Sequence, residues 1–331
     1  MGIIDTVILN SSGGFWHSII GWFESITPSF ALAIILFTVV LKIVLSPMDF
    51  FQKKLMRDNT EKQAELKPEI DKLKKKYKND SNKLNQKTME LYKRENYSLG
   101  GNCLGMVLSL GLTMVIFLTL FFAIRDIGEQ RLENQFLQLQ EVYQNEQEIE
   151  DAEEAVIEKY SEIRESFIWI RNIWRPDTTT SPIPDYETFI DTTSFSPDLD
   201  SEDDFYLEES TYNDVMGTLR QSESGWNGLF ILSILAALTS FLSQKTLKKQ
   251  SPKKENKANS NEPEMPNLNI LTYILPLLMV YITTIFNSAF AMYIVMNSMM
   301  TFIISIASFK ILDKYKKESK KSQKVNNNNK A

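Results

Sequence analysis

Apolar and charged residues are strongly segregated along this chain of 331 residues, and the segregation limits the folds that it can adopt. The mean hydropathy of −0.20 is that of a water-soluble protein, but the average hides apolar runs separated by highly charged stretches. A run of about 18 or more mostly apolar residues can cross the hydrocarbon core of a bilayer as a helix. Five such runs are present, at residues 29–48, 103–124, 226–243, 269–286 and 288–309.

Each run is predicted to be a membrane-spanning helix, because in lipid only a helix satisfies all its backbone polar groups within one segment. The fourth and fifth runs are separated only by a turn near Asn287 and Ser288, which predicts a tight helical hairpin. The expected fold class is therefore an all-α polytopic membrane protein with a bundle of five transmembrane helices.

The distribution of Lys and Arg predicts the orientation, because short loops rich in these residues stay in the cytoplasm. Segments 50–102, 244–268 and 310–331 carry net charges of +6, +3 and +6. Segment 125–225 has 7 Lys and Arg against 26 Asp and Glu, a net charge of −19. We therefore expect a multi-pass protein of the plasma or inner membrane. Its N-terminus and segment 125–225 would lie outside, and its C-terminus would lie in the cytoplasm.

Residues 1–28 precede the first span and contain an amphipathic pattern. Between Phe15 and Ile26, large apolar residues fall on one helical face, and polar or small residues fall on the other. Such a helix can lie in the membrane interface with its aromatic side chains at headgroup depth. An ordinary packed helix is the alternative, but the interfacial interpretation is favoured because a span follows directly.

Segment 49–102, on the cytoplasmic side, is predicted to form a hairpin of two helices. An apolar stripe recurs at helical spacing, at Leu66, Ile70, Leu73 and Tyr77. Residues 78–82 carry a turn signal, and Pro68 is expected to kink or restart the first helix. A solvated charged hairpin and a docking arm for a cytoplasmic machine or a nascent chain are equally consistent with these residues.

The basic tail, residues 310–331, also has two interpretations. It can anchor the topology near anionic lipid. It can also bind ribosomal RNA through phosphate contacts. Segment 244–268 is expected to be a cytoplasmic loop.

The acidic segment 125–225 is expected to have two parts. Residues 129–165 are rich in Glu, Gln and Leu and are predicted to be helical, extending the second span outward. Residues 175–215 are rich in Pro, Asp, Ser and Thr and are predicted to be loop-like. Because runs of like charge are usually solvated, a solvated insertion is favoured over a binding site for an external partner.

Lys42 is the only ionisable residue well inside any apolar run. It lies about 20 Å along the helix axis from the outer end near Ser29, in the inner half of the hydrocarbon region. A charge at this depth is costly, so its default interpretation is functional, as a cation that attracts acidic or polar segments of a translocating chain. The alternative is that the side chain snorkels to the cytoplasmic headgroups, and depth alone favours neither.

The sequence contains no pattern for covalent or metal chemistry. No paired carboxylates or metal-ligand cluster accompany Lys42, and there is no Walker loop, dinucleotide fingerprint or nucleophile constellation. His17 is the only histidine, and Cys103 is the only cysteine. We therefore expect no enzymatic activity, no cofactor and no metal.

Five short patterns occur in a fixed order: LKIVLSPM at 41–48, LKPEI at 66–70, LYKRENYSLGGNCL at 91–104, SFIWI at 166–170 and FAMY at 290–293. This ordered set resembles the YidC/Oxa/Alb family of membrane protein insertases. The resemblance covers all five runs and the first cytoplasmic loop. In it, Lys42 falls on an arginine of the family's first core helix.

The resemblance implies a five-helix core around a hydrophilic groove that is open to the cytoplasm and to lipid but closed outside. Lys42 would receive the hydrophilic outer segment of a substrate, and Thr239 and Ser240 are further candidate groove residues. The implied function is a membrane protein insertase and chaperone that works without ATP hydrolysis. The implied partners are nascent membrane proteins, the ribosome through the basic tail, the Sec translocon or signal recognition particle machinery, and the lipid bilayer.

The chain departs from the family pattern at several positions. The groove cation is a lysine, which lacks the five-donor fork of arginine. Gly105, Ser109 and Gly111 stand where the family's second core helix has a Pro and Gln pattern. Ile294 stands in place of a tryptophan, and Asn287 in place of a proline at the hairpin tip. These differences indicate a divergent bacterial member.

Two other functions remain open from the sequence. A small transporter or channel would use Lys42 in an anion site, but it predicts further intramembrane polar groups, broken helices or inverted repeats, which are not evident. A membrane-anchored scaffold would bind a partner through its acidic outer domain and would leave Lys42 dispensable.

Overall fold

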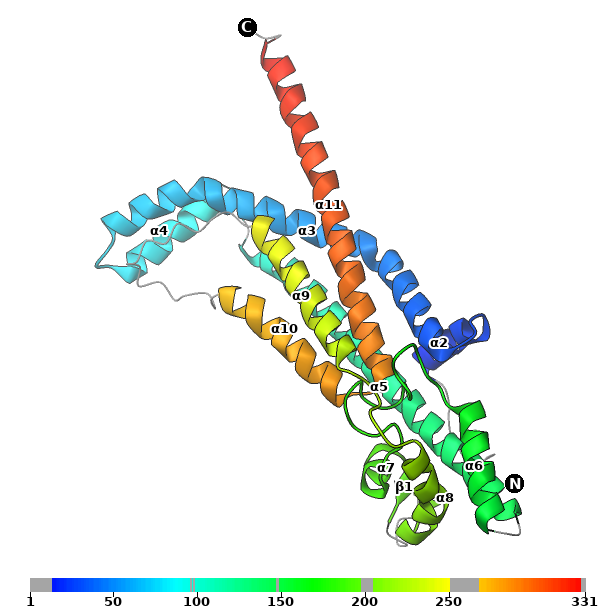
Figure 1. The fold of residues 1–331 in the computed structure, drawn as a ribbon. Coiled ribbons are helices and arrows are strands. Elements are labelled where there is room, and N and C mark those ends of the chain that lie inside the picture. The colour runs from blue at the N-terminus through cyan, green and yellow to red at the C-terminus, as the bar shows by residue number, and fades with distance from the viewer. Residues whose placement is uncertain are drawn as a thin grey trace. The chain divides into compact units, whose positions relative to one another are not determined.

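The computed structural model describes residues 14–95, 97, 99–146, 149–197, 205–250 and 268–328, most of which are helical (Figure 1). In chain order the helices are α2 (Phe15–Ser25), α3 (Phe30–Lys76), α4 (Ser81–Arg94), α5 (Leu99–Asn145), α6 (Ile149–Ile163), α7 (Tyr186–Thr192), α8 (Glu209–Ser222), α9 (Ile231–Gln250), α10 (Leu268–Ile285) and α11 (Ser288–Asn328). Two short strands, β1 (Phe195–Ser196) and β2 (Phe205–Tyr206), pair in parallel.

Three of the described helices contain a segment that is long and apolar enough to cross a membrane. The helical ranges that contain such a segment are Phe30–Lys76, which is all of α3, Gly111–Asn145 in α5 and Ser288–Glu318 in α11. Shorter apolar stretches occur at Ile231–Thr246 in α9 and Pro276–Ile285 in α10. The chain is thus a mostly helical, multi-pass membrane protein, and the count of five crossings stays a prediction.

The chain divides into two compact units, and several of the long helices contribute to both. Unit 1 contains residues 1–40, 117–240 and 273–298. Unit 2 contains residues 41–116, 241–272 and 299–331. Unit 1 therefore holds the acidic segment, and unit 2 holds the basic ones.

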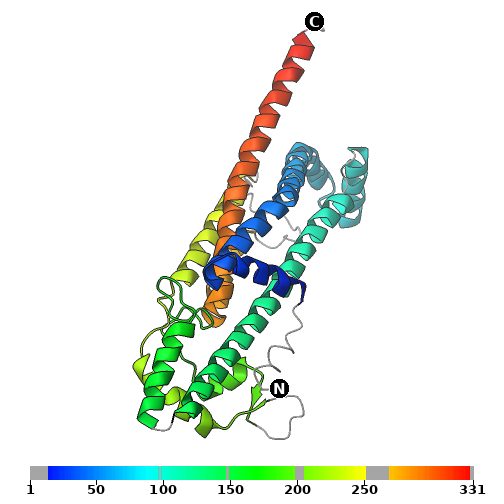
Figure 2. The same cartoon turned by 90° about the vertical axis from the view of Figure 1, so that its right-hand side faces the viewer.

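Unit 1 has an aromatic core built around the extension of α5. The Phe136 ring of α5 lies 5.2 Å from that of Phe189 in α7 and 5.5 Å from that of Tyr212 in α8, measured between centroids. α5 runs without interruption to Asn145, and α6 lies beside its end in both views (Figures 1 and 2). The prediction that residues 129–165 are helical is confirmed for α5 up to Asn145 and for α6. Only the part up to Asn145 extends the helix of the second apolar run, because α6 is a separate helix.

The prediction that residues 175–215 are loop-like is right for residues 175–185, which form no helix or strand. It is wrong for residues 186–196 and 205–215, most of which lie in α7, β1, β2 and α8. This segment contains α7 and the beginning of α8, and its Ile183, Phe189 and Tyr212 side chains are at most 1 % exposed. Its apolar residues are separated by Pro, Ser, Thr and acidic residues, so no periodicity marks them in the sequence. They are nevertheless buried against α5, which is distant in sequence, because removing apolar surface from water favours packing. The described residues of this segment therefore belong to a folded unit.

Some apolar side chains of α2 are buried in unit 1, and others are exposed. Ile20 and Phe23 are buried in unit 1, and the Trp16 Nε1–H donates to Thr119 Oγ1 of α5 at 2.9 Å. Phe15 and Trp22, in contrast, remain exposed. One side of α2 is therefore packed against the protein, and its placement in the membrane interface stays a prediction.

In unit 2, α3 continues to Lys76 through Pro47 and Pro68. Of the two outcomes predicted for Pro68, a restart of the helix is therefore wrong, and a kink stays a prediction. Leu66, Ile70 and Leu73 of this part of α3 pack with Leu91 and Tyr92 of α4 and with Tyr97. This burial stabilises the helix across a residue that removes one backbone hydrogen bond. The Asp80 side chain caps α4 by accepting from the Lys83 N–H at 3.0 Å.

Candidate functional site

Lys42 lies on a covered face of α3 in unit 2. Its side chain is buried at 9 % exposure, whereas the next two residues, Ile43 and Val44, are 57 % and 68 % exposed. The protein therefore covers the lysine while its neighbours face outward. A side chain snorkelling freely along a lipid-facing surface would be exposed, so this burial favours a protein-facing ammonium.

A row of polar residues continues from Lys42 along the same face of α3. Asp49, Lys53 and Arg57 follow at 7, 11 and 15 residues, which are helical spacings, and Gln52 lies beside them. We call these five residues the polar stripe.

Two polar atoms in the polar stripe are buried and unpaired. Asp49 Oδ2 and Gln52 Nε2 have no hydrogen-bond partner among the residues that the structure describes. A buried polar atom without a partner is costly, and a buried carboxylate oxygen is more costly still. These atoms are therefore able to bind water or a polar peptide group that reaches α3.

At the other end of the polar stripe, Arg57 is paired with charged residues of both α3 and α11. Arg57 contacts Asp313 at 2.9 Å and Glu61 at 3.2 Å, and Lys316 Nζ contacts Glu61 Oε1 at 2.5 Å. The hydrogen bond from Lys316, followed by that from Arg57, holds the pKa of the Glu61 carboxyl below its usual value. We call these four residues the clasp, which joins α3 to α11 within unit 2.

Thr239 and Ser240 lie next to each other on α9. The Thr239 hydroxyl donates to the backbone oxygen of Leu235 at 2.7 Å, so its own helix already satisfies it. Ser240 is buried at 8 % exposure. These two residues belong to unit 1 and Lys42 belongs to unit 2, so neither unit contains all three candidates.

In unit 1, residues 173–177 cap the first turns of two apolar helices, and we call them the capping segment. Asp177 is fully buried, and its two carboxylate oxygens accept from the N–H groups of Leu229 at 2.8 Å and Leu232 at 2.7 Å, where α9 begins. The Arg175 carbonyl accepts from both the N–H and the hydroxyl of Ser288, the first residue of α11. The N–H groups at a helix start have no partner within the helix, so this segment supplies the missing acceptors.

Residues 22–321 match the family model described as 60Kd inner membrane protein. The chain belongs to this family. The resemblance drawn from the short patterns is therefore confirmed. The match includes the polar stripe, the clasp, the capping segment and both candidate residues on α9.

Curated relatives of this 60Kd inner membrane protein family member carry the name "Membrane protein insertase YidC". The Clostridium tetani protein is 42 % identical over 80 residues, which are 24 % of this chain and 34 % of the relative. The Anaeromyxobacter sp. (strain Fw109-5) protein is 38 % identical over 99 residues, 30 % of this chain and 17 % of the relative. The Fusobacterium nucleatum protein is 37 % identical over 89 residues, 27 % of this chain and 42 % of the relative. The chain thus spans less than half the length of these relatives.

Of the five residues in the polar stripe, the sequence predicted only Lys42 as a functional residue. Asp49 and Gln52 follow the predicted end of the first span, so they were assigned to the charged cytoplasmic segment. The spacing from Lys42 could have predicted them. Asp49 and Lys53 follow Lys42 at 7 and 11 residues, and residues at these spacings share a helical face. Gln52 lies next to Lys53.

Proposed function

We propose that this chain inserts other membrane proteins into the bilayer and assists their folding, without hydrolysing ATP. The observation that carries the proposal is the buried Lys42, aligned with Asp49 on one face of α3, in a family whose relatives are named insertases. No covalent step is required. The protein lowers a solvation barrier.

The barrier is the free energy needed to move a polar segment of the protein being inserted, which we call the client, through hydrocarbon. Each backbone polar group without a partner costs several kcal/mol there. A wet groove lined by Lys42 and Asp49 would supply water and charged partners through the inner part of this path. The client segment then crosses a shorter apolar distance, and burial of its own apolar helix in lipid drives its release.

Two of the four charged residues of the polar stripe, Lys42 and Asp49, fit different parts of a client. The Lys42 ammonium would hold acidic residues and backbone carbonyl groups, and the Asp49 carboxylate would hold N–H groups and basic residues. In this proposal Gln52 and Lys53 continue the path toward the cytoplasm, and Thr239 and Ser240 contact the client from α9.

The proposal includes a topology and a set of partners. The chain would cross the cell membrane five times, with its N-terminus and the acidic segment outside. Residues 49–102 would form a cytoplasmic arm that engages nascent chains or signal recognition particle machinery. The basic tail, residues 310–331, would contact the ribosome, and the Sec translocon would share some clients.

Site-specific crosslinking in cells tests this function. A photoreactive residue at position 42 should capture nascent membrane proteins. The same probe at position 44 is a matched control, because Val44 lies on the same helix but is 68 % exposed. Capture of clients at position 42 and of lipid at position 44 supports the proposal. Capture of only lipid and neighbouring helices at both positions supports a scaffold instead.

A further inference from the structure

Two large apolar residues of unit 1 have a backbone conformation that side chains disfavour. Ile168 has φ of 51° and Phe230 has φ of 59°, and they are the non-glycine residues with positive φ among those described. For a β-branched residue such as Ile168 this conformation is a real outlier. Such strain persists only where the surrounding structure enforces it, and it gathers at functional positions.

Ile168 stands at the tip of a tight turn. The backbones of Phe167 and Ile170 exchange two hydrogen bonds, of 2.9 and 2.8 Å, that close the turn. Ile170 is 1 % exposed and fixes the base, whereas Ile168 is 83 % exposed. The strained geometry therefore keeps a large apolar side chain directed away from the protein.

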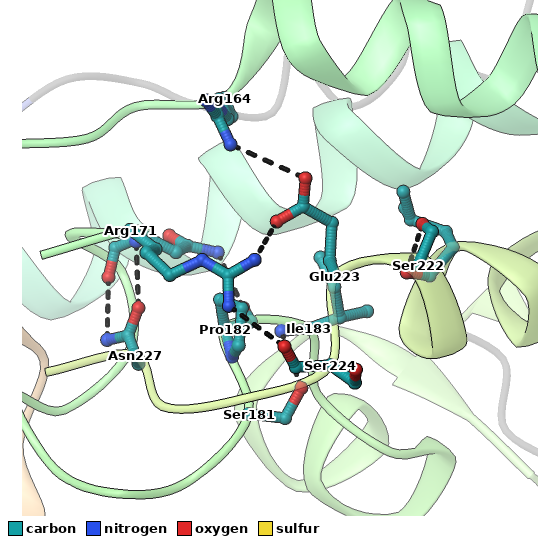
Figure 3. Close-up of polar contacts among 11 residues, drawn as sticks. Arg164, Arg171, Ser181, Pro182, Ile183, Ser222, Glu223, Ser224 and Asn227 are labelled. Atoms are coloured by element: carbon teal, nitrogen blue, oxygen red, sulfur yellow. Dashed lines mark hydrogen bonds and ion pairs between the residues drawn. The ribbon is translucent and has the colours of Figure 1, made fainter.

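The base of this turn is tied to the segment that precedes α9 (Figure 3). The Arg171 guanidinium pairs with Glu223 and donates to the Ser224 carbonyl at 3.2 Å. The backbone N–H of Arg171 donates to the Asn227 carbonyl at 3.1 Å. Asn227 is fully buried, and its side chain accepts from the Asn172 N–H at 2.8 Å and donates to the Asn172 carbonyl at 3.0 Å.

The segment held in this way carries exposed apolar residues of its own. Trp226 is 60 % exposed, and Leu229 and Phe230 are also exposed. The exposed apolar surface then continues on α9, at Ile234 and Leu238. We call Ile168, Trp226, Leu229 and Phe230 the apolar rim.

The charges beside the apolar rim are paired. Glu223 lies between Arg164, at 3.4 Å, and Arg171, so its carboxylate faces two guanidinium groups (Figure 3). A paired charge costs less to bring toward an apolar phase than an isolated charge does.

We propose that the apolar rim inserts into the headgroup region of the bilayer at the surface where α9 enters the membrane. Lipid is the partner because the rim is continuous with the exposed apolar surface of α9 in a multi-pass membrane protein. Tryptophan is also enriched at this depth. The insertion sets the depth of unit 1 in the headgroup region. Because the turn at Ile168 is hydrogen-bonded to the segment before α9, it also sets the depth at which α9 begins. This role does not depend on the insertase function.

Quenching of a fluorescent label in lipid vesicles tests the proposal. The full chain with Cys103→Ser would be reconstituted in phosphatidylethanolamine and phosphatidylglycerol vesicles. An environment-sensitive label would be attached at Ile168→Cys or Trp226→Cys, or at Glu187→Cys, an exposed position on α7, as the control. Labels at 168 and 226 should be quenched several-fold more strongly by spin-labelled headgroup lipids than the label at 187, and less by aqueous iodide.

Two results would overturn the proposal. If iodide quenched all three labels equally, the rim would lie in water. If the labels at 168 and 226 were protected from both quenchers, a protein surface would cover the rim instead of lipid.

Variants at position 168 distinguish a change in the membrane depth of the apolar rim from a change in folding stability. Ile168→Gly removes the strain, so its melting temperature in detergent should equal or exceed that of the parent, while the label at 226 becomes more accessible to iodide. Ile168→Asp should increase that accessibility further. A label at 226 that stays at parental depth in both variants would contradict the proposal.

Discussion

At the residue scale, the position of α9 depends on the close approach of Gly228 to Asp177. A Cβ atom added at Gly228 would lie 1.9 Å from Asp177 Oδ1 and 2.8 Å from Asp177 Cα. Both distances are shorter than real contacts, so only glycine fits here. This approach is what allows the Asp177 carboxylate to accept from the N–H groups of Leu229 and Leu232.

Gly228→Ala should therefore destabilise unit 1. Displacing Asp177 leaves buried N–H groups without acceptors, at a cost of about 1–3 kcal/mol. Denaturant unfolding in detergent measures the loss. Gly217→Ala is the matched control, because nothing lies within 4 Å of its added Cβ in helix α8. That control should stabilise α8 by about 0.5–1 kcal/mol, since alanine is the better helix former. Equal effects of the two variants would contradict the account of the capping segment.

At the element scale, α3 and α11 are joined by the clasp through partly exposed charges. The side chains of Glu61 and Asp313 are 44 % and 54 % exposed, so water and salt screen their ion pairs. Each pair contributes about 1 kcal/mol or less. The clasp therefore fixes the register of the two helices more than it stabilises the fold.

The clasp should weaken in acid. The pKa of Glu61 is lower in the folded protein than in the unfolded chain. Its stabilisation is thus complete above the unfolded pKa, near 4.3, and is lost as pH falls through the folded pKa. Glu61→Gln should lower stability at pH 7 and flatten its decline in acid. Unfolding measured from pH 7 to 3 tests this, with Glu65→Gln, an exposed residue of the same helix, as control. A parallel decline in parent and Glu61→Gln would refute the role of Glu61.

The aromatic core should be the main source of stability in the extension of α5. Phe136 is 1 % exposed and contacts rings from α7, β1 and α8. Phe136→Ala should cost about 3–5 kcal/mol, because it leaves a cavity among these rings. Phe122→Ala, on the same helix at 51 % exposure, should cost far less in detergent unfolding. Similar losses in the two variants would contradict the claim that the aromatic core is the main source of stability.

At the scale of the whole molecule, the sequence predicted the features that depend on local composition. The apolar runs, the helical character of residues 129–165 and the family could be predicted because each is marked by contiguous residues. The aromatic core could not, because Phe136 and Tyr212 are far apart in sequence and sit among polar neighbours. The capping role of Asp177 also depends on contacts that no spacing encodes. Lys42 was found because a charge inside an apolar run is conspicuous, whereas Asp49 was hidden among the cytoplasmic charges.

Insertion by the purified chain tests the central claim most directly. The parent and its Lys42 variants would be reconstituted in vesicles without nucleotide, with a single-span client that carries a short acidic outer tail. The rate at which the tail becomes protected from protease would be measured. Lys42→Arg should insert the client, whereas Lys42→Ala and Lys42→Glu should be at least about ten-fold slower, equivalent to about 1.4 kcal/mol of barrier. Insertion at the parental rate by both Lys42→Ala and Lys42→Glu would contradict the account.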